Sequence, residues 1–430
     1  MFDRYEAGEQ AVLVHIHFSD DEKKEDLDEL KLLVNSAGVT TLGTVTGPRK
    51  VPHARYFVGT GKAQEIADTV QTLGADVVIF NHSLSPAQQR NLEALCQCLV
   101  LDRTALILDI FAQRARTYEG KLQVELAQLR FMSTRLIRGW THLDKQKGGV
   151  GMRGPGETQL ETDRRLLSVR ITAIKGRLAK VAKQRDQGRR ARQRAELPTI
   201  SLVGYTNAGK STLFNQITGA GVYAADKLFA TLDPTLRQVS VEDVGNCILA
   251  DTVGFVRHLP HDLVAAFKAT LQETREATLL LHVVDCSDEH YRDNIEAVHS
   301  VLADIDAGDI AQLTVMNKID ACDDVAPHID VDEQGKPIRV WLSAHTGQGV
   351  ELLFEALTSL LSGQIRALQL ALPPAQGKLR AAFYELNCIE SEHYNENGDC
   401  LLDIRINNVD LSRVRKQFDG ALEACLVQNK

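Results

Sequence analysis

A glycine-rich stretch of eight residues that ends in a lysine and a hydroxyl side chain carries the sharpest chemical signal in the chain. Residues 204–211, Gly-Tyr-Thr-Asn-Ala-Gly-Lys-Ser, fit the pattern G-x-x-x-x-G-K-[ST]. They follow an apolar run at 200–203, which predicts a strand, and precede a helical pattern at 212–217. In that setting backbone N–H groups surround phosphates at a helix N-terminus. We therefore expect Lys210 to reach the β- and γ-phosphates of a nucleotide and Ser211 to bind Mg²⁺.

Two later motifs, each at the end of a predicted strand, would complete a nucleotide site. The strand at 248–251 leads into Asp-Thr-Val-Gly. We expect Asp251 to support Mg²⁺ through water, and the Gly254 N–H to sense the γ-phosphate. The strand at 313–316 leads into Asn-Lys-Ile-Asp. The Asp320 carboxylate would accept two N–H bonds from guanine that adenine cannot supply, and ligand sites at the carboxyl ends of parallel strands are the general rule.

The base would be held by two further groups of residues. Asn317 and Lys318 would brace the loop and cover the base. Another predicted strand leads into Ser343, Ala344 and His345, and the Ser-Ala backbone would contact guanine O6. These motifs in this order predict an α/β domain that hydrolyses GTP.

The segment 228–233, Leu-Phe-Ala-Thr-Leu-Asp, is the candidate first switch. A threonine in this position completes Mg²⁺ coordination only while the γ-phosphate is present. We assign this role to Thr231, with Thr235 as the alternative.

Two residues bear on the rate of hydrolysis. Many GTPases place a glutamine after Asp-x-x-Gly to orient the attacking water, whereas this chain has Phe255. A phenyl ring cannot orient water, so we predict slow intrinsic hydrolysis with a catalytic element supplied or ordered by a partner. Asn207 could help to hold a monovalent cation such as K⁺; a purely structural role is the alternative, and rates that do not differ between K⁺ and Na⁺ would favour it.

The elements around these motifs predict four domains within the 430 residues. In residues 1–110 short β-type runs at 11–18, 56–58, 76–80 and 99–101 alternate with helical patterns, which predicts a small parallel sheet covered by helices. The GTPase domain would occupy 197–365. A small α+β appendage would occupy 366–430, with a linker at 373–377 and strand-like stretches at 380–387 and 400–406.

Residues 111–196 lie between the first two α/β domains and carry an unusual charge. From Phe111 to Ala195 there are 21 Lys and Arg against 7 Asp and Glu, although the whole chain has a net charge of −8. Leucines at helical spacing predict two long helices packed as an antiparallel hairpin. The hairpin tip at 145–157 holds five glycines and one proline. An exposed, basic, glycine-rich backbone suits close approach to folded RNA.

The sequence resembles the HflX family of ribosome-associated GTPases. The resemblance rests on the run Gly-Gly-Val-Gly-Met-Arg-Gly-Pro-Gly-Glu-Thr-Gln-Leu-Glu-Thr-Asp-Arg-Arg at 148–165 and on Asp-Thr-Val-Gly-Phe-Val-Arg-His-Leu-Pro at 251–260. It implies a GTPase that binds the large (50S) ribosomal subunit and its rRNA, with the glycine-rich tip reaching toward the peptidyl-transferase region. It also implies action on 70S ribosomes, in splitting, recycling or rescue under stress, or in ribosome biogenesis.

The motif match to this family implies a nucleotide site built from five segments. GTP or GDP would be bound by Gly204, Tyr205, Thr206, Asn207, Ala208, Gly209, Lys210, Ser211, Phe229, Ala230, Thr231, Leu232, Asp233, Asp251, Thr252, Val253, Gly254, Asn317, Lys318, Ile319, Asp320, Ser343, Ala344 and His345. The Mg²⁺ ligands would be Ser211 and Thr231. The residues closest to the chemistry would be Lys210, Thr231, Gly254 and Asn207.

Composition excludes several other classes of protein. No run of 18 apolar residues and no basic-then-apolar leader is present, so we expect a cytoplasmic protein without stable membrane insertion. We also expect a monomer. The eight scattered cysteines predict reduced thiols rather than a disulfide scaffold. An alternative hypothesis is a GTPase that regulates a membrane complex or proteolysis through the hairpin, and liposome flotation without ribosome binding would favour it.

Overall fold

The computed structural model describes most of the chain. The described residues are 9–18, 27–135, 159–195, 197–219, 228–229, 231–242, 244–256, 271–362, 365–386, 388–395, 398–407 and, toward the C-terminus, 411, 414–415, 417–418, 422 and 425–427. The predicted hairpin tip and Ala230 lie outside this part of the chain. Within it, no helix is both long enough and apolar enough to cross a membrane.

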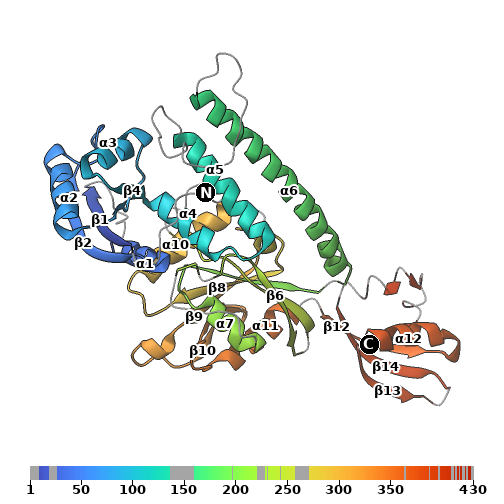
Figure 1. Ribbon diagram of the computed structural model, residues 1–430. Coiled ribbons are helices and arrows are strands. Elements are labelled where there is room, and N and C mark those ends of the chain that lie inside the picture. Colours follow the sequence, from blue (N-terminus) through green and yellow to red (C-terminus); the bar gives the residue numbers. More distant parts are fainter. Residues whose placement is uncertain are drawn as a thin grey trace.

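The N-terminal domain is a four-stranded parallel sheet with helices on it, blue in Figure 1. Its strands, in the spatial order β2-β1-β3-β4, are β1 (Gln10–Phe18), β2 (Thr40–Arg49), β3 (Val77–Phe80) and β4 (Leu99–Asp102). Its helices are α1 (Leu27–Ala37), α2 (Thr60–Leu73), α3 (Pro86–Cys96) and α4 (Arg103–Arg114). The predicted strands at 11–18, 76–80 and 99–101 are thus confirmed.

Strand β2 was not predicted from the sequence, because glycines and a proline interrupt its apolar pattern. A short strand predicted at 56–58 forms only an isolated bridge between His53 and Phe57. Helix α4 continues past residue 110, so the predicted boundary between the first two domains falls inside this helix.

Two long helices, α5 (Tyr118–Arg135) and α6 (Gln159–Ala195), lie side by side in Figure 1, to the right of the N-terminal domain and above the third domain. Leu122, Leu126 and Ile174 are buried between them. Arg170 forms an ion pair with Glu125 at 2.6 Å. The apolar side chains at helical spacing therefore face the partner helix, while most of the described side chains of α6 remain exposed.

A seven-stranded sheet forms the centre of the third domain, in the order β10-β11-β9-β8-β5-β7-β6. Its strands are β5 (Thr199–Gly204), β6 (Thr235–Val241), β7 (Gly245–Asp251), β8 (Leu279–Asp285), β9 (Gln312–Asn317), β10 (His328–Val331) and β11 (Pro337–Trp341). Strands β7, β5, β8, β9 and β11 are parallel, and an antiparallel strand closes each edge. Its helices are α7 (Lys210–Thr218), α9 (Gln272–Arg275), α10 (Tyr291–Asp304) and α11 (Val350–Ser362).

The C-terminal domain is an antiparallel sheet of β12 (Ile365–Leu372), β14 (Cys400–Asn407) and β13 (Ile389–Tyr394), with helix α12 (Gly377–Glu385). The strand predicted at 400–406 is confirmed. The strand predicted at 380–387 is wrong, because this stretch lies in and just after α12. Leu379 and Phe383, four residues apart, are both fully buried, which is helical and not strand spacing. The predicted linker at 373–377 is a short 3₁₀ helix, Pro374–Gln376, that leads into α12.

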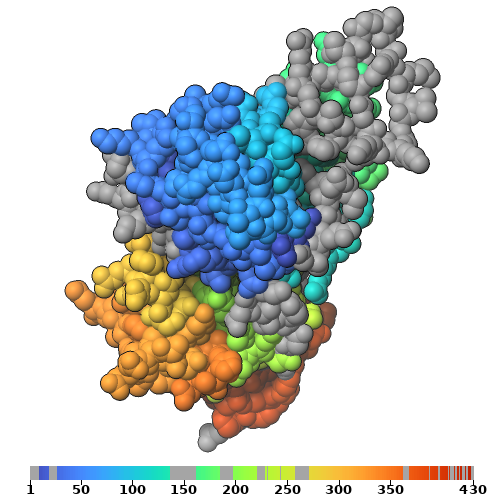
Figure 2. Space-filling model, turned by 60° about the vertical axis from the view of Figure 1, so that its left-hand side comes forward, coloured from blue at the N-terminus to red at the C-terminus, as the bar shows by residue number. Residues whose placement is uncertain are grey.

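The N-terminal domain sits directly on the GTPase-like domain, as Figure 2 shows for the blue and the green-to-orange surfaces. One continuous apolar core joins the two, with Ile107 and Phe111 of α4 in the same cluster as Phe229, Leu232 and Phe255. The candidate first switch is therefore part of the interface between the domains.

Candidate nucleotide-binding site

The phosphate-binding loop connects β5 to α7, where the sequence places it. Gly204 and Gly209 have φ values of +151° and +92°. A side chain at either position would lie 2.2 Å from a neighbouring atom, the Val283 carbonyl oxygen or the Asn317 side-chain nitrogen. These two positions therefore require glycine both for backbone conformation and for space.

Lys210 is buried at the start of α7. Its Nζ donates hydrogen bonds to the carbonyl oxygens of Gly204 at 3.1 Å and Tyr205 at 2.7 Å. Burial lowers the pKa of the Lys210 ammonium to about 8, and the Asp251 carboxylate partly opposes this shift. An anionic phosphate beside Lys210 would favour the charged form of this lysine.

Two hydroxyls and one carboxylate meet next to the phosphate-binding loop. Ser211 Oγ donates to Asp251 Oδ2 at 2.8 Å, and Thr231 Oγ1 donates to the same oxygen at 2.9 Å. The two hydroxyl oxygens are 2.8 Å apart. Thr235, the alternative to Thr231, begins β6 and pairs in register with Asp251. Of the two threonines, the structure thus brings the Thr231 hydroxyl to this cluster.

The cluster fits a divalent cation. Asp251 is fully buried, and its second oxygen, Oδ1, has no hydrogen-bond partner among the described residues. Burial raises the pKa of the Asp251 carboxyl. A hard cation offsets both effects, because it prefers hydroxyl and carboxylate oxygens and neutralises the buried charge.

The base-recognition turn, defined here as Asn317–Asp320, is braced from two sides. The Asn317 side chain donates to the Ala208 carbonyl oxygen of the phosphate-binding loop and accepts the N–H of Ala344, both at 2.8 Å. Lys318 has a φ of +69° and pairs with Asp285 at 2.6 Å. The Asp320 carboxylate is partly exposed and lies 4.0 Å from His345 Nδ1. Four segments that are remote in the sequence therefore meet around Asn317.

The predicted contact of the Ser-Ala backbone with guanine O6 needs one refinement. The Ser343 N–H donates to the Gln348 carbonyl oxygen and the Ala344 N–H to Asn317 Oδ1. We therefore regard the N–H of His345, which follows them, as the better candidate for guanine O6.

After β7, Gly254 lies beside the phosphate-binding loop, whereas the Phe255 ring points into the core between the domains. A side chain at Gly254 would lie 3.1 Å from Lys210 Nζ, so its backbone passes close to the Lys210 ammonium group. Phe255 exchanges backbone hydrogen bonds with Gly204 and Thr206, and its ring is buried in the interdomain core. That buried ring cannot orient water, as predicted from its type.

The candidate switch has side-chain contacts that the sequence did not reveal. The Phe229 ring packs edge-on against Phe111 of α4, with ring centroids 4.6 Å apart. The Asp233 carboxylate accepts the backbone N–H groups of Arg116 and Thr117, each at 2.9 Å, and the Thr117 hydroxyl. Asp233 therefore binds the chain where it enters α5. These partners are more than 100 residues away in sequence, so no local pattern signals them.

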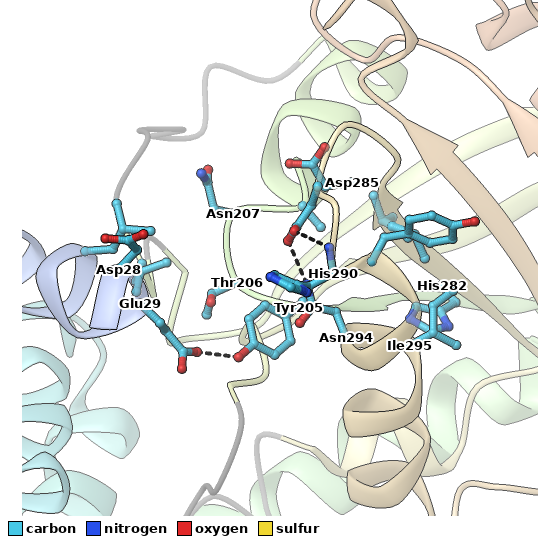
Figure 3. Close-up of a pocket in the computed structure, with 17 residues that line it drawn as sticks. Asp28, Glu29, Tyr205, Thr206, Asn207, His282, Asp285, His290, Asn294 and Ile295 are labelled. Atoms are coloured by element: carbon cyan, nitrogen blue, oxygen red, sulfur yellow. Dashed lines mark hydrogen bonds between the residues drawn. The ribbon is translucent and has the colours of Figure 1, made fainter. Parts of the chain in front are cut away.

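A cavity of about 150 Å³ lies beside the phosphate-binding loop, between α1, the end of β8 and α10 (Figure 3). On its wall the Tyr205 hydroxyl donates to Glu29 of α1. Asn207 is exposed and has a φ of +63°. The cavity includes Thr206 and Ala208 of the loop. It is thus a space flanking the loop at the domain interface.

The sheet, the phosphate-binding loop and the base-recognition turn together define a P-loop GTPase. Comparisons with known proteins agree. Family models match in the order GTP-binding GTPase N-terminal (residues 24–112), GTP-binding GTPase middle region (114–192), 50S ribosome-binding GTPase (199–318) and HflX C-terminal domain (331–423).

Curated relatives extend over nearly the whole chain. The GTPase HflX of Escherichia coli (strain K12) is 66% identical over 98% of this chain and 99% of its own length. That of Magnetococcus marinus is 46% identical over 89% of both. A solved GTP-binding protein from Sulfolobus solfataricus in complex with GDP aligns with 83% of this chain and 99% of its own, at 23% identity and a TM-score of 0.43. The chain belongs to the HflX family, and it is a GTP-hydrolysing enzyme with a GTPase domain of the ribosome-binding kind.

The buried His282 of β8 makes the stability of the GTPase domain depend on pH. Burial, the neighbouring His299 and Lys210 lower its pKa from 6.5 to about 3. The unfolded chain therefore binds one proton more than the folded chain between these pH values, and stability falls as pH drops below 6.5. One such group changes the free energy of unfolding by up to about 1.4 kcal/mol per pH unit.

When the pH falls from 7.5 to 5, we expect the Tm of the His282→Phe variant to decrease less than the Tm of the unsubstituted protein. Thermal unfolding at both pH values measures this difference. The same loss of Tm in both proteins would show that His282 does not carry this dependence.

Proposed function

We propose that this chain is a Mg²⁺-dependent GTPase that docks on the large (50S) ribosomal subunit in its GTP-bound form. Ser211 and Thr231 hold Mg²⁺, with Asp251 supporting it, and the ion neutralises charge on the phosphates. Lys210 binds the β- and γ-phosphates and the Gly254 N–H senses the γ-phosphate. GTP hydrolysis of this kind relies on positioning and electrostatic stabilisation.

The other residues of the five segments complete the proposed nucleotide site. Asp320 reads guanine, while Asn317 and Lys318 brace the turn. Backbone groups of the phosphate-binding loop and of the switch line the phosphates. Asn207 is the candidate to hold K⁺, a role that hydrolysis rates in K⁺ and in Na⁺ would test.

The observation that carries the proposal is the direct link between the switch and the helical hairpin. Thr231 reaches the Mg²⁺ cluster, and two residues later Asp233 binds Arg116 and Thr117 at the start of α5. A switch that moves when the γ-phosphate leaves would therefore displace the start of α5, where the hairpin begins. Through this contact the bound nucleotide can change the position of the positively charged hairpin.

The charge of the hairpin supports RNA as its partner. Lys175, Arg177, Lys180 and Lys183 of α6 are all exposed, in a segment with 14 more positive than negative charges. Such a surface neutralises phosphates and gives binding that weakens steeply with salt. The remainder of the chain is acidic and would not bind RNA indiscriminately. We propose that docking leads to splitting, recycling or rescue of stalled ribosomes, or serves their assembly.

Cosedimentation with purified large subunits tests the docking step. We expect binding with a non-hydrolysable GTP analogue, weaker binding with GDP, and loss of binding as salt rises. We also expect slow hydrolysis alone and stimulation by ribosomes. Failure to cosediment in the presence of the GTP analogue at low salt would contradict the proposal.

Gly120→Ala isolates the link between switch and hairpin. A side chain at Gly120 in α5 would lie 2.2 Å from Asp233 Oδ1, whereas one at Gly176 in α6 meets no atom within 4 Å. Alanine has a higher helix propensity than glycine, so neither substitution should weaken its helix. Only Gly120→Ala should disturb the contact of Asp233 with the start of α5. Losing a cap-like carboxylate contact costs about 1–2 kcal/mol, so we expect ribosome-stimulated GTP hydrolysis to fall roughly 5- to 30-fold.

The control Gly176→Ala should keep the stimulated rate. Equal stimulation in both variants would exclude the Asp233 contact as the coupling element. Circular dichroism would confirm that both variants remain folded.

A further inference from the structure

Two cysteines from separate parts of the GTPase domain touch each other next to the base-recognition turn. Cys286 directly follows β8, and Cys322 directly follows the short 3₁₀ helix Ile319–Ala321. Their sulfur atoms are 3.3 Å apart, although the residues are 36 positions apart in the sequence. A disulfide needs a sulfur–sulfur distance of about 2.05 Å, so a shift of about 1.3 Å, within the reach of side-chain rotation, would join them.

The pair lies where β8 and the base-recognition turn are already fastened together. The Cys286 N–H donates to the Asn317 carbonyl oxygen at 3.0 Å, and Asp285 pairs with Lys318 at 2.6 Å. Cys322 Sγ lies 3.7 Å from the Lys318 carbonyl oxygen. A bond between the two sulfurs would add a covalent link to the hydrogen bond and the ion pair that already join the end of β8 to the turn. Both side chains are half-buried, so a small oxidant can reach them while the fold holds them in contact.

We propose that Cys286 and Cys322 form a reversible disulfide under hydroperoxide stress, and that this bond locks the base-recognition turn. Disulfides in a reducing compartment are characteristically transient and redox-sensing. The sequence alone predicted eight reduced thiols, and the structure adds the contact between these two.

The oxidation consumes one hydroperoxide and two thiols. One cysteine attacks the peroxide as a thiolate: an S–O bond forms, the O–O bond breaks, and the departing oxygen leaves as water after taking a proton. The other sulfur then attacks the resulting sulfenic acid: the S–S bond forms and a second water leaves. With hydrogen peroxide, two thiols and one peroxide give one disulfide and two waters. A dithiol reductant restores both thiols.

The consequence for nucleotide binding rests on the proposed base-reading role of Asp320, two residues before Cys322. A cross-link between β8 and this turn would restrict any motion of the turn away from β8 during the release of guanine. We therefore expect bound GDP to dissociate more slowly from the oxidised protein. By linkage, if oxidation tightens GDP binding, then GDP favours the disulfide by the same factor.

Peptide mapping tests the bond itself. The full-length protein is treated with equimolar hydrogen peroxide, its free thiols are blocked with iodoacetamide, and it is digested with trypsin. Cys286 falls in the peptide 276–292, and Cys322 in 319–339 because Pro337 prevents cleavage after Lys336. We expect these two peptides to be linked until dithiothreitol is added. Recovery of both only as alkylated single peptides would overturn the proposal.

Release of fluorescent GDP tests the lock. We expect the dissociation rate to fall at least threefold on oxidation and to recover with dithiothreitol. Cys322→Ser should abolish the effect, and Cys98→Ser, a half-buried cysteine of the N-terminal domain, should retain it. An unchanged rate in protein shown to carry the disulfide would overturn the locking role. Failure of the base-reading role would instead appear as unchanged base selectivity in Asp320→Asn, whatever the state of the thiols.

Discussion

Gly209→Ala is expected to reduce the affinity for GDP and GTP by roughly 30-fold or more. A methyl group at this position would lie 2.2 Å from the Asn317 side-chain nitrogen, in a backbone with a φ of +92°. Either the phosphate-binding loop or Asn317 must move. Because Asn317 binds both Ala208 and Ala344, its displacement would disconnect the phosphate site from the base site. Two lost buried hydrogen bonds at about 1–3 kcal/mol each give a loss of this size.

Gly219→Ala is the matched control for this prediction. Gly219 ends the same helix α7, also with a left-handed backbone at a φ of +62°, but a side chain there meets no atom within 4 Å. It therefore carries the backbone strain of about 1 kcal/mol without the steric clash. Isothermal titration with GDP should show near-normal affinity for Gly219→Ala. Similar losses in both variants would mean that backbone strain, and not contact with Asn317, governs binding.

Asp320→Asn is expected to change the preferred base from guanine to xanthine. The carboxylate would accept two N–H bonds from guanine, and an amide can accept only one of them. A hydrogen bond to a charged group contributes about 1.5–3 kcal/mol, so the loss of one of them should lower the affinity for GTP by roughly 10- to 10²-fold. An amide N–H can donate to the 2-oxo group of xanthine, so xanthosine triphosphate should bind better than GTP.

Competition of both triphosphates against fluorescent GDP measures this change. Asp323→Asn, an exposed carboxylate three residues further on, is the control and should leave the preference for guanine intact. Unchanged affinities for GTP and xanthosine triphosphate in Asp320→Asn would remove Asp320 from the base site.

The sequence was sufficient to predict those parts of the site that local motifs encode. Lys210 and Ser211 begin a helix that follows a strand. Asp251 and Asn317 are each the last residue of a strand, as predicted from their motifs. Glycine spacing, apolar runs and strand ends are local properties, so one chain suffices to recognise them. The sequence favoured Thr231 over Thr235 for the switch, and the structure brings the Thr231 hydroxyl to Ser211 and Asp251.

The features that the sequence did not reveal are contacts between distant segments. The bonds of Asp233 to Thr117, the packing of Phe229 on Phe111 and the approach of Cys286 to Cys322 all join residues from separate elements. Such contacts depend on how domains and strands are placed, which no single-chain pattern records. The wrongly assigned strand at 380–387 has a different origin: a short apolar run is ambiguous between strand and helix, and packing on the sheet decides.

Sedimentation of intact ribosomes with this protein tests the central claim most directly, that GTP binding drives the chain onto the large subunit. Ribosomes are incubated with the protein and either a non-hydrolysable GTP analogue or GDP, and intact particles are then separated from subunits on a sucrose gradient. We expect the protein to comigrate with large subunits, and intact particles to decrease, with the GTP analogue but not with GDP. Equal distributions with both nucleotides, or no comigration with either, would contradict it.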